Sequence, residues 1–385
     1  MDRRLLMLAL GMFAMGTDNF VVAGILPGVA ASLGTSVSVA GQMVTVYALS
    51  FAILAPIMAA VAGGWPRKTL LVSALGIFVV GNIITAMATD MHTVLASRAL
   101  AGLGAAMFSP TAMGVAASLV PAERRGRALS TVTAGLAGAT ALGAPIGTFI
   151  GGLGDWRTTL WFVAALGLAA MIGLWVMLRK LPQPDPISLR ARFAPIKDMR
   201  ITLTLLTTLF AFGGLLMVYT YIGLTFDRVT GGNARILAGL LLFWGVAATV
   251  GNLMSGRLVD RFESRRIINI ALVVMVIDFI ALPWTSGHIV TAVIALGVWG
   301  VCGWGLLVPQ QHRLVKIAPH VAPLLLALNN TATYAGLACS GLIGGIVLLS
   351  IDKHYLSLIG AIALVLAVVM AELAHGRIGR TAPLS

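Results

Sequence analysis

Apolar residues fill twelve stretches of the chain, and each stretch is long enough to cross a bilayer as a helix. A membrane-spanning helix needs roughly 20 mostly apolar residues with few charges. The pattern predicts helices over Leu5–Leu26, Val39–Ala62, Leu70–Ala88, Val94–Leu119, Leu129–Gly151, Thr158–Leu178, Ile201–Phe226, Ile236–Leu258, Ile267–Trp284, Ile289–Val308, Leu324–Leu349 and Tyr355–Leu373. We therefore expect an all-α membrane protein with twelve transmembrane helices.

The basic residues of the connecting segments fall almost entirely on alternate sides of the predicted membrane. With the N-terminus placed inside, the outer loops hold only four basic residues, namely Arg157, Arg228, Arg235 and Lys353. Arg98 lies within a predicted helix, and all other Lys and Arg fall on the inner side. Because Lys and Arg are enriched in cytoplasmic loops, both termini are predicted to be cytoplasmic.

Composition supports a membrane protein and changes the meaning of the charge. A net charge of +13 would suggest a nucleic-acid partner in a soluble protein. Here 59% of the residues are hydrophobic and only 10% are charged, so the basic residues serve as topological signals and contacts to anionic lipids. We expect a lipid bilayer and no nucleic acid as partners. Cys302 and Cys339 both lie in predicted helices, so a disulfide framework is not expected.

A proline-rich segment divides the chain into two halves. The apolar pattern stops between Arg179 and Arg200, where four prolines appear among charges. We predict a six-helix bundle over residues 1–180, a cytoplasmic linker over 181–200 and a second six-helix bundle over 201–385. The segments after the second and eighth helices resemble each other weakly, and the fifth and eleventh helices are both rich in glycine. Two related bundles with a site between them are typical of a transporter.

Four segments in order resemble motifs of the major facilitator superfamily. They are Gly256 to Arg266 after the eighth helix, Arg98 to Ala106 in the fourth, Pro121 to Ala128 after it, and Gly143 to Gly152 in the fifth. The last is similar to a motif of the superfamily's drug:proton antiporters with twelve spans. Gly16 to Phe20 and Pro309 to Arg313 are similar to a bacterial subgroup that exports arabinose, chloramphenicol and purine nucleosides.

This resemblance implies a major facilitator fold of two pseudo-symmetric bundles, a bacterial inner membrane location and a monomer. It also implies a gating loop formed by Asp260, Arg261, Arg265 and Arg266. It implies a helix 5 antiporter-type motif formed by Gly143, Pro145, Gly147, Gly151 and Gly152. The chain departs from the family pattern twice. The first-half loop lacks the usual acidic residue, and Ala144 separates Gly143 from Pro145. A simpler explanation for the charged residues of the gating loop is a solvated surface cluster. A simpler explanation for the glycines of helix 5 is close helix packing.

Three ionisable side chains lie clearly inside the predicted helices: Asp18, Arg98 and Asp278. A charge at the bilayer centre costs at least ~2.5 kcal/mol, so each needs a partner or a function. Asp18 lies about 10 Å and Arg98 about 6 Å below the outer surface, so the two can meet. One hypothesis makes Asp18 the proton carrier, because burial favours its protonated form and Arg98 its charged form. The alternative is a permanent structural ion pair. Asp278 is a second candidate acid, for which a protonated, hydrogen-bonded structural role is the alternative.

Polar and aromatic residues near the predicted helix centres are candidates for a substrate cavity. They are Asn19, Gln42, Tyr47, Tyr219, Trp299, Trp304, Gln310, Asn329, Asn330 and Tyr334. Each of them could equally form an interhelical hydrogen bond or lie at the membrane surface. Together with 17 Met residues they suggest an adaptable, mostly apolar pocket with a few polar anchors.

Energy for transport is expected to come from an ion gradient. The chain has no Gly-x-x-x-x-Gly-Lys-Ser/Thr sequence, no cluster with metal-ligand spacing and no nucleophile motif. We therefore expect no cofactor, no metal and no enzymatic activity. The first hypothesis is a proton-coupled antiporter that exports small amphipathic molecules such as antibiotics by alternating access. Alternatives are a sugar or nucleoside exporter, an uncoupled facilitator, and a membrane receptor with a transporter-like body.

Overall fold

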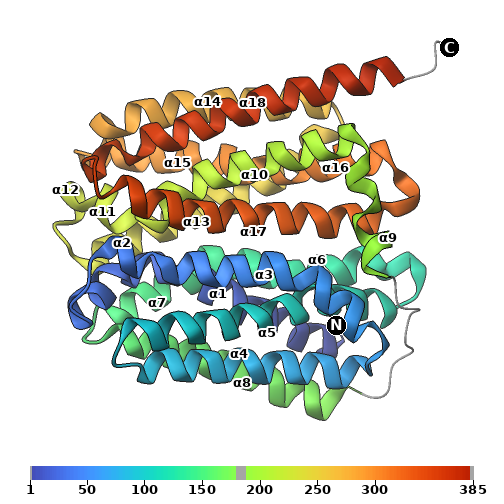
Figure 1. Cartoon of the computed structure of the whole chain (residues 1–385), viewed down its shortest axis with the longest axis horizontal. Helices are drawn as coiled ribbons and strands as arrows, with labels where there is room; N and C mark the ends of the chain where they lie inside the picture. The colour runs from blue at the N-terminus through green and yellow to red at the C-terminus, as the bar shows by residue number, and fades with distance from the viewer. Residues whose placement is uncertain (1, 179–187, 382–385) are drawn as a thin grey trace. The chain divides into compact units, whose positions relative to one another are not determined.

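The computed structural model describes residues 2–178 and 188–381, and within these ranges every regular element is a helix (Figure 1). This confirms the predicted all-α class. Most of the predicted linker, residues 181–187, lies outside the described residues, as do Arg179 and Lys180.

The long helices are α1 (Arg3–Ser32), α3 (Gln42–Val61), α4 (Arg67–Met87), α5 (Met91–Ser118), α8 (Trp156–Met177), α10 (Met199–Thr220), α13 (Ala234–Val259), α14 (Ser264–Thr285), α15 (Ile289–Gly305), α17 (Ala322–Val347) and α18 (Leu356–Thr381). The fifth span consists of α6 (Arg125–Gly138), the π-helix η3 (Ala139–Gly143) and α7 (Ala144–Gly151). The shorter elements are α2 (Val37–Ala40), η1 (Ala62–Gly64), η2 (Ala122–Arg124), α9 (Leu189–Phe193), η4 (Ala194–Lys197), α11 (Ile222–Thr225), α12 (Asp227–Thr230), α16 (Leu307–Ile317), η5 (Pro319–Val321) and η6 (Lys353–Tyr355).

Eleven helical segments are long and apolar enough to cross a membrane. The twelfth predicted span corresponds to α17, which has 26 residues and no charged side chain. It is not among the eleven. Its sequence includes Asn329, Asn330 and four glycines, which lower its hydropathy relative to the other spans. Length and the absence of charge still make α17 suitable for crossing a bilayer inside a helical bundle.

The chain divides into two compact units. The first contains residues 1–188 and 232–242, and the second contains residues 189–231 and 243–385. Helix α13 therefore belongs to the first unit up to Leu242 and to the second from Phe243 onward. The boundaries predicted for the two bundles and the linker remain a prediction.

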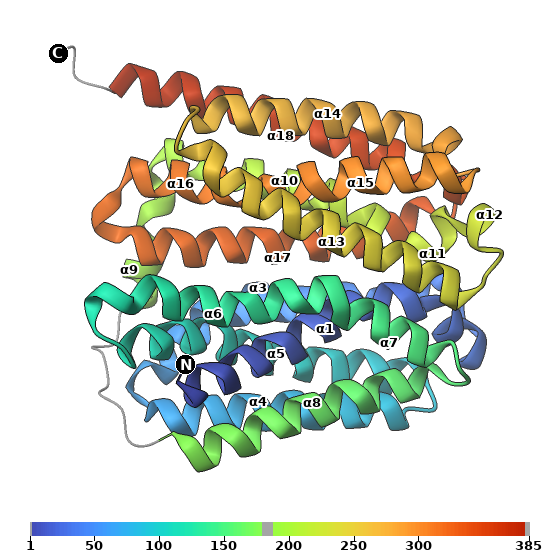
Figure 2. The same ribbon diagram turned by 180° about the vertical axis from the view of Figure 1, so that it is seen from behind.

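The two units repeat the same pairs of neighbouring helices. In the first unit, α1 packs against α6 and α8, while α4 packs against α5 and α8 (Figures 1 and 2). In the second unit, α10 packs against α17 and α18, while α14 packs against α15 and α18. These are the first, third, fourth, fifth and sixth spans of each half in corresponding roles. The shared pairing is what a structural repeat predicts.

Besides the fifth span, the seventh and tenth spans are interrupted where a single helix was predicted. The span predicted over 201–226 ends at Thr220 and continues as the short pieces α11 and α12, with Tyr221 and Phe226 between them outside helical geometry. The span predicted to end at Val308 extends to Ile317 and breaks at Leu306. Pro309 accounts for the second break, because proline lacks an N–H and its ring clashes with the preceding turn.

Candidate functional site

A buried ion pair joins two spans of the first unit. The Arg98 Nη1 of α5 donates to the Asp18 Oδ1 of α1 at 2.7 Å. The two side chains are 1% and 0% exposed, so neither reaches solvent. Arg98 also lies over the ring of Tyr47 in α3, with 4.6 Å from the guanidinium carbon to the ring centre. The depth arithmetic thus correctly anticipated the contact, although the roles of the two residues remain predictions.

Glycines allow three helices to converge on Arg98. A Cβ atom at Gly102 would lie 2.5 Å from the carbonyl oxygen of Tyr47, so α3 and α5 approach closely one turn from Arg98. A Cβ atom at Gly81 would lie 2.8 Å from the backbone nitrogen of Ala101, which brings α4 equally close. Small residues permit such approaches between membrane helices. The close packing excludes water and places the ion pair in a medium of low polarity.

The ion pair leaves polar atoms unsatisfied. Within the described residues, Asp18 Oδ2 and Arg98 Nε have no hydrogen-bond partner. A guanidinium and a carboxylate commonly pair through two parallel hydrogen bonds, which would have used more of these atoms. Each unsatisfied buried polar atom costs about 1–3 kcal/mol, more when it is charged. Such a cost is unusual in a purely structural pair and is typical of a site where contacts change.

The fifth span packs against the segment of α1 that contains Asp18. A Cβ atom at Gly143 would lie 2.0 Å from Thr17 Oγ1, and one at Gly147 would lie 2.4 Å from Val21 Cγ2. The π-helix η3 ends directly before α7, whose first turn contains Pro145. A wider turn at this place relieves the clash that proline makes with the preceding turn.

The remaining glycines of the helix 5 motif are also sites of close contact. A Cβ atom at Gly151 would lie 2.6 Å from Thr159 Oγ1, and one at Gly152 would lie 2.3 Å from the Ala234 Cβ. All four glycines therefore have a packing function in this unit. The prediction of an antiporter-type role for the motif stays a prediction.

A polar network lies buried in the second unit. Thr208 of α10 donates to Asn329 Oδ1 of α17 at 2.7 Å, and Gln310 Nε2 of α16 donates to Thr208 Oγ1 at 3.2 Å and to the carbonyl of Thr204 at 3.3 Å. Asn329 and Gln310 are 1% and 2% exposed. Two predicted cavity residues are thus occupied in joining three helices of one unit.

An aromatic cluster fills another part of the second unit. Tyr219 of α10 lies against Trp244 of α13, with ring centres 4.6 Å apart, and Trp244 lies 5.5 Å from Trp299 of α15. Trp304 contacts both Trp244 and Phe212 at its edge. Tyr219, Trp244 and Trp299 are buried, whereas Trp304 is half-buried. Of this cluster, Trp304 is therefore the predicted cavity residue with surface left to meet a ligand.

The other predicted cavity residues differ in their surroundings. Gln42 begins α3 and donates to the carbonyl of Ser38 at 3.2 Å, which is a contact within its own turn. Asn19 is half-buried, and its Oδ1 has no hydrogen-bond partner within the described residues. Asn330 is exposed and Tyr334 is half-buried. The Tyr47 ring faces Arg98, as described above.

Asp278 of α14 differs from Asp18 in forming no ion pair with the described residues. It is half-buried, and its Oδ2 has no hydrogen-bond partner among them. Cys302 of α15 lies near enough for the carboxyl to act on its thiol. Both roles of Asp278, a proton-binding acid and a structural residue, stay predictions.

The predicted gating loop spans the end of α13 and the start of α14: Asp260 and Arg261 lie between the helices, and Arg265 and Arg266 lie in the first turn of α14. Asp260, Arg261, Arg265 and Arg266 are all exposed. Arg265 pairs with Glu372 of α18 at 2.6 Å rather than with Asp260, and Asn269 also donates to Glu372. Among the described residues, no hydrogen bond or ion pair with Asp260 is found. The role predicted for this loop in gating stays a prediction.

Sequence reasoning missed two polar residues at these sites. Asn82 of α4 is fully buried and interacts with the Asp18 carboxyl, while its Nδ2 donates to the carbonyl of Phe78 at 3.1 Å. Glu372 lies inside a predicted helix but was not singled out. A lone polar residue within an apolar run is the signal that could have found both.

Helices of this length, arranged as a repeated bundle with a buried charge pair, define a polytopic membrane transport protein. Residues 8–336 match the model of the Major Facilitator Superfamily, and the chain belongs to that family.

Relatives from bacteria are similar over most of the chain. The "Chloramphenicol resistance protein" of Streptomyces lividans is 31% identical over 315 residues, which are 78% of each protein. The "Inner membrane transport protein YdhP" of Escherichia coli (strain K12) is 29% identical over 367 residues, covering 95% of this chain and 94% of the relative. A crystal structure of a D-xylose-proton symporter shares the fold, with a TM-score of 0.81 at 17% identity over 97% of this chain and 96% of the symporter.

Proposed function

We propose that the protein is a proton-coupled exporter of small amphipathic molecules in the bacterial cytoplasmic membrane. It acts as a monomer, as the resemblance to the family implies. Both termini lie in the cytoplasm, as the distribution of basic residues suggests. Support for export comes from the relative named a chloramphenicol resistance protein, and support for the location from the relative named an inner membrane transport protein. The observation that carries the proposal is the buried, incompletely satisfied pair of Asp18 and Arg98.

Asp18 is the group that takes up and releases the proton. When its carboxyl is protonated, Arg98 loses its ionic partner but remains charged, because a guanidinium does not release its proton in proteins. An unpaired buried charge costs about 3–5 kcal/mol. The contact between Arg98 and Tyr47 exists while Asp18 is charged, so it does not offset this cost.

This cost ties protonation to a change of conformation. A state in which Arg98 reaches water, a substrate dipole or another acceptor is favoured as soon as Asp18 takes a proton. A proton from outside therefore biases the transporter toward one state, and its release inside biases it back. Two states with different proton affinities are what coupling a proton to alternating access requires.

The packing around Asp18 supplies the rigid frame for this change. The glycines of the fifth span hold α1 at Thr17 and Val21, on the turns beside Asp18. A movement of α1 therefore requires the fifth span to move with it. The π-helix η3 and Pro145 make that span the one most able to bend at this depth.

Of the predicted cavity residues in the second unit, Trp304, Asn330 and Tyr334 fit a substrate surface best. They are half-buried or exposed, whereas Tyr219, Gln310 and Asn329 are buried within the same unit. An indole, a phenol and an amide would suit a ligand with an apolar body and a few hydrogen-bonding groups. This set matches the amphipathic molecules proposed as substrates.

A resistance profile tests the proposal. A bacterial strain that overproduces the protein is grown against chloramphenicol, sugar analogues and nucleoside analogues, alongside strains that produce Asp18→Asn or Asp278→Asn. We expect resistance to at least one amphipathic compound, its loss in Asp18→Asn and its retention in the matched variant Asp278→Asn. Resistance confined to sugar or nucleoside analogues would replace the proposed substrate class. Equal resistance with Asp18→Asn would contradict the role of Asp18.

A further inference from the structure

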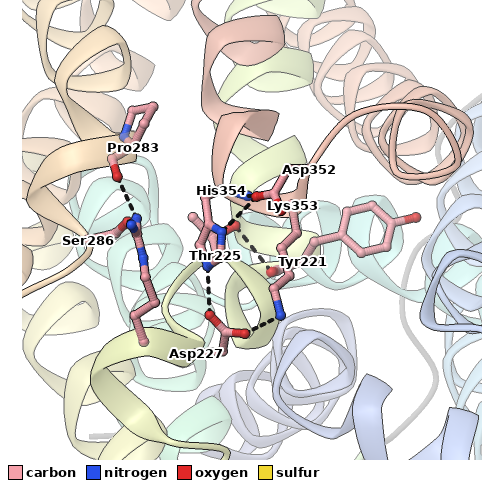
Figure 3. Close-up of polar contacts among 9 residues, drawn as sticks. Tyr221, Thr225, Asp227, Pro283, Ser286, Asp352, Lys353 and His354 are labelled. Carbon is pink, nitrogen blue, oxygen red and sulfur yellow. Dashed lines mark hydrogen bonds and ion pairs between the residues drawn. The ribbon is translucent and has the colours of Figure 1, made fainter.

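A cluster of charged residues closes one end of the second unit. His354 of η6 lies between two carboxylates, with Nε2 2.8 Å from Asp227 Oδ1 and Nδ1 2.7 Å from Asp352 Oδ1 (Figure 3). Lys353 forms an ion pair with the other oxygen of Asp227. Asp352 also accepts the backbone N–H of His354 at 2.9 Å. Asp227 belongs to α12, so the cluster joins two segments that are far apart in sequence.

The geometry requires one proton more than a neutral imidazole carries. Neutral histidine has one ring N–H and one acceptor nitrogen, and a carboxylate can only accept. With carboxylate oxygens at hydrogen-bond distance from both ring nitrogens of His354, one contact would set two lone pairs against each other. The conflict disappears when the ring is doubly protonated, or when one of the acids carries the extra proton. In either case the cluster binds one additional proton.

The surroundings supply no competing charge. Lys353 and His354 are the charged groups that act on the Asp227 and Asp352 carboxyls. Burial raises the pKa of Asp227, but the hydrogen bonds from Lys353 and His354 more than offset it and hold that pKa below its usual value. Hydrogen bonds from His354 likewise lower the pKa of Asp352. Both acids therefore stay negative well into the acid range, which keeps the extra proton on the ring.

Among the described residues, the elements packed against η6 bring no further charged group to the ring. η6 packs against α11, α14 and α18. α11 is uncharged, α14 ends in Pro283, Trp284 and Thr285, and α18 has no charged residue before Glu372. Arg228, next to Asp227, donates instead to the carbonyl of Pro283 and to Ser286 Oγ. Tyr355 follows the cluster in sequence and is 48% exposed.

The cluster fixes a segmented part of the chain. Beyond Thr220 the seventh span continues only as the short pieces α11 and α12. Tyr221, at the first break, donates to the carbonyl of Gly341 at 2.7 Å and so holds the base of this segment. Its far piece, α12, is held to η6 by Asp227 and to the end of α14 by Arg228. Loss of the contacts to η6 would leave α12 attached through Arg228 and able to move away from η6 while α10 stays in place.

We propose that Asp227, Asp352 and His354 form a proton-binding site that clamps α12 to η6. The predicted topology places this end of the unit outside the cell, so external acid would close the clamp and external alkali would open it. His354 is 18% exposed, so solvent protons can reach it. The site is separate from Asp18 and does not depend on proton-coupled transport.

Pulsed electron paramagnetic resonance measures the clamp directly. Spin labels are attached at Val229→Cys and Ser350→Cys of the full chain in detergent, with Cys302→Ser and Cys339→Ser to remove the native thiols. The distance is recorded from roughly pH 5 to 9, a range that includes the usual titration of histidine and leaves lysine charged. We expect one narrow distance in acid and a longer, broader one in alkali. The ratio of the two populations should change about tenfold per pH unit, as for one proton.

Two histidine variants separate this site from general effects of pH. His354→Gln keeps polarity and size but cannot take the proton, so the distance should no longer depend on pH. His288→Gln removes a histidine whose ring forms no hydrogen bond within the described residues, and it should behave like the parent. A parent distance that is constant across the range, or a pH response that persists in His354→Gln, would overturn the proposal.

Discussion

Asp18 can become neutral by taking a proton, whereas Arg98 stays charged. This difference predicts how much folding free energy each residue's substitution costs. Asp18→Asn removes the only ionic partner found for Arg98 within the described residues and leaves a buried guanidinium that stays charged. The expected loss of folding free energy is about 3–5 kcal/mol. The Tyr47 contact is already present in the parent, so it does not reduce this loss.

Arg98→Gln should cost less, because the carboxyl that remains can take a proton and become neutral. Its cost should also fall by about 1.4 kcal/mol for each pH unit of acidification, because protonation of the Asp18 carboxyl is then easier. The fall should stop at the pH where this carboxyl is protonated in both the folded and the unfolded protein. The double variant Asp18→Asn with Arg98→Gln contains no buried charge at this site. It should recover most of the stability lost in Asp18→Asn, because removing both partners is often close to neutral.

Unfolding of the purified protein in one detergent, followed by tryptophan fluorescence, measures these differences. The parent, both single variants and the double variant are compared at neutral and acid pH. We expect the order of stability to be parent, double variant, Arg98→Gln and Asp18→Asn, with a coupling energy of a few kcal/mol. The reasoning would be refuted if the stability losses of the two single variants added up to the loss of the double variant, or if Asp18→Asn were as stable as the parent. Either result would show that Asp18 and Arg98 do not stabilise each other.

Three further substitutions, with Gly114→Ala as a control for the first, test the packing, the polar network and the loop. Gly143→Ala should destabilise the protein by about 1–3 kcal/mol, because its Cβ would meet Thr17, and Gly114→Ala in open helix surface should be neutral or stabilising by up to about 1 kcal/mol. Asn329→Leu should cost about 1–3 kcal/mol, because it removes the 2.7 Å acceptor of Thr208 and leaves only the 3.4 Å contact with the carbonyl of Thr204. Asp260→Ala should leave the unfolding free energy within about 0.5 kcal/mol, and reduced transport would then support a role in gating. Detergent unfolding and a transport assay measure these effects.

The spans could be predicted because hydrophobic length is a physical requirement of the bilayer. The predicted stretch Ile236–Leu258 lies within two residues of α13 at both ends. Breaks inside a span were harder to predict. The span that begins at Ile201 is interrupted at Tyr221, whose phenol reaches across to the carbonyl of Gly341. That tertiary contact leaves no trace in the hydrophobic pattern.

The contact at the candidate site could be predicted only in part. Depth along each helix placed Asp18 and Arg98 at similar levels, because the rise per residue is constant. The rotation of each helix is set by packing, which the sequence does not show directly. For this reason the contact of the Tyr47 ring with Arg98 could not be predicted, and a place for Tyr47 in a substrate cavity stays a prediction. Asn82 was missed for the same reason.

Substrate transport driven by a pH gradient tests the central claim most directly. The parent and Asp18→Asn are reconstituted into proteoliposomes with the compound to which the parent gives the strongest resistance, and uphill flux and downhill exchange are measured separately. We predict uphill flux only with the parent and exchange with both proteins, which also shows that the variant is folded. Uphill flux with Asp18→Asn at the parent's rate would contradict the claim that this carboxyl carries the proton.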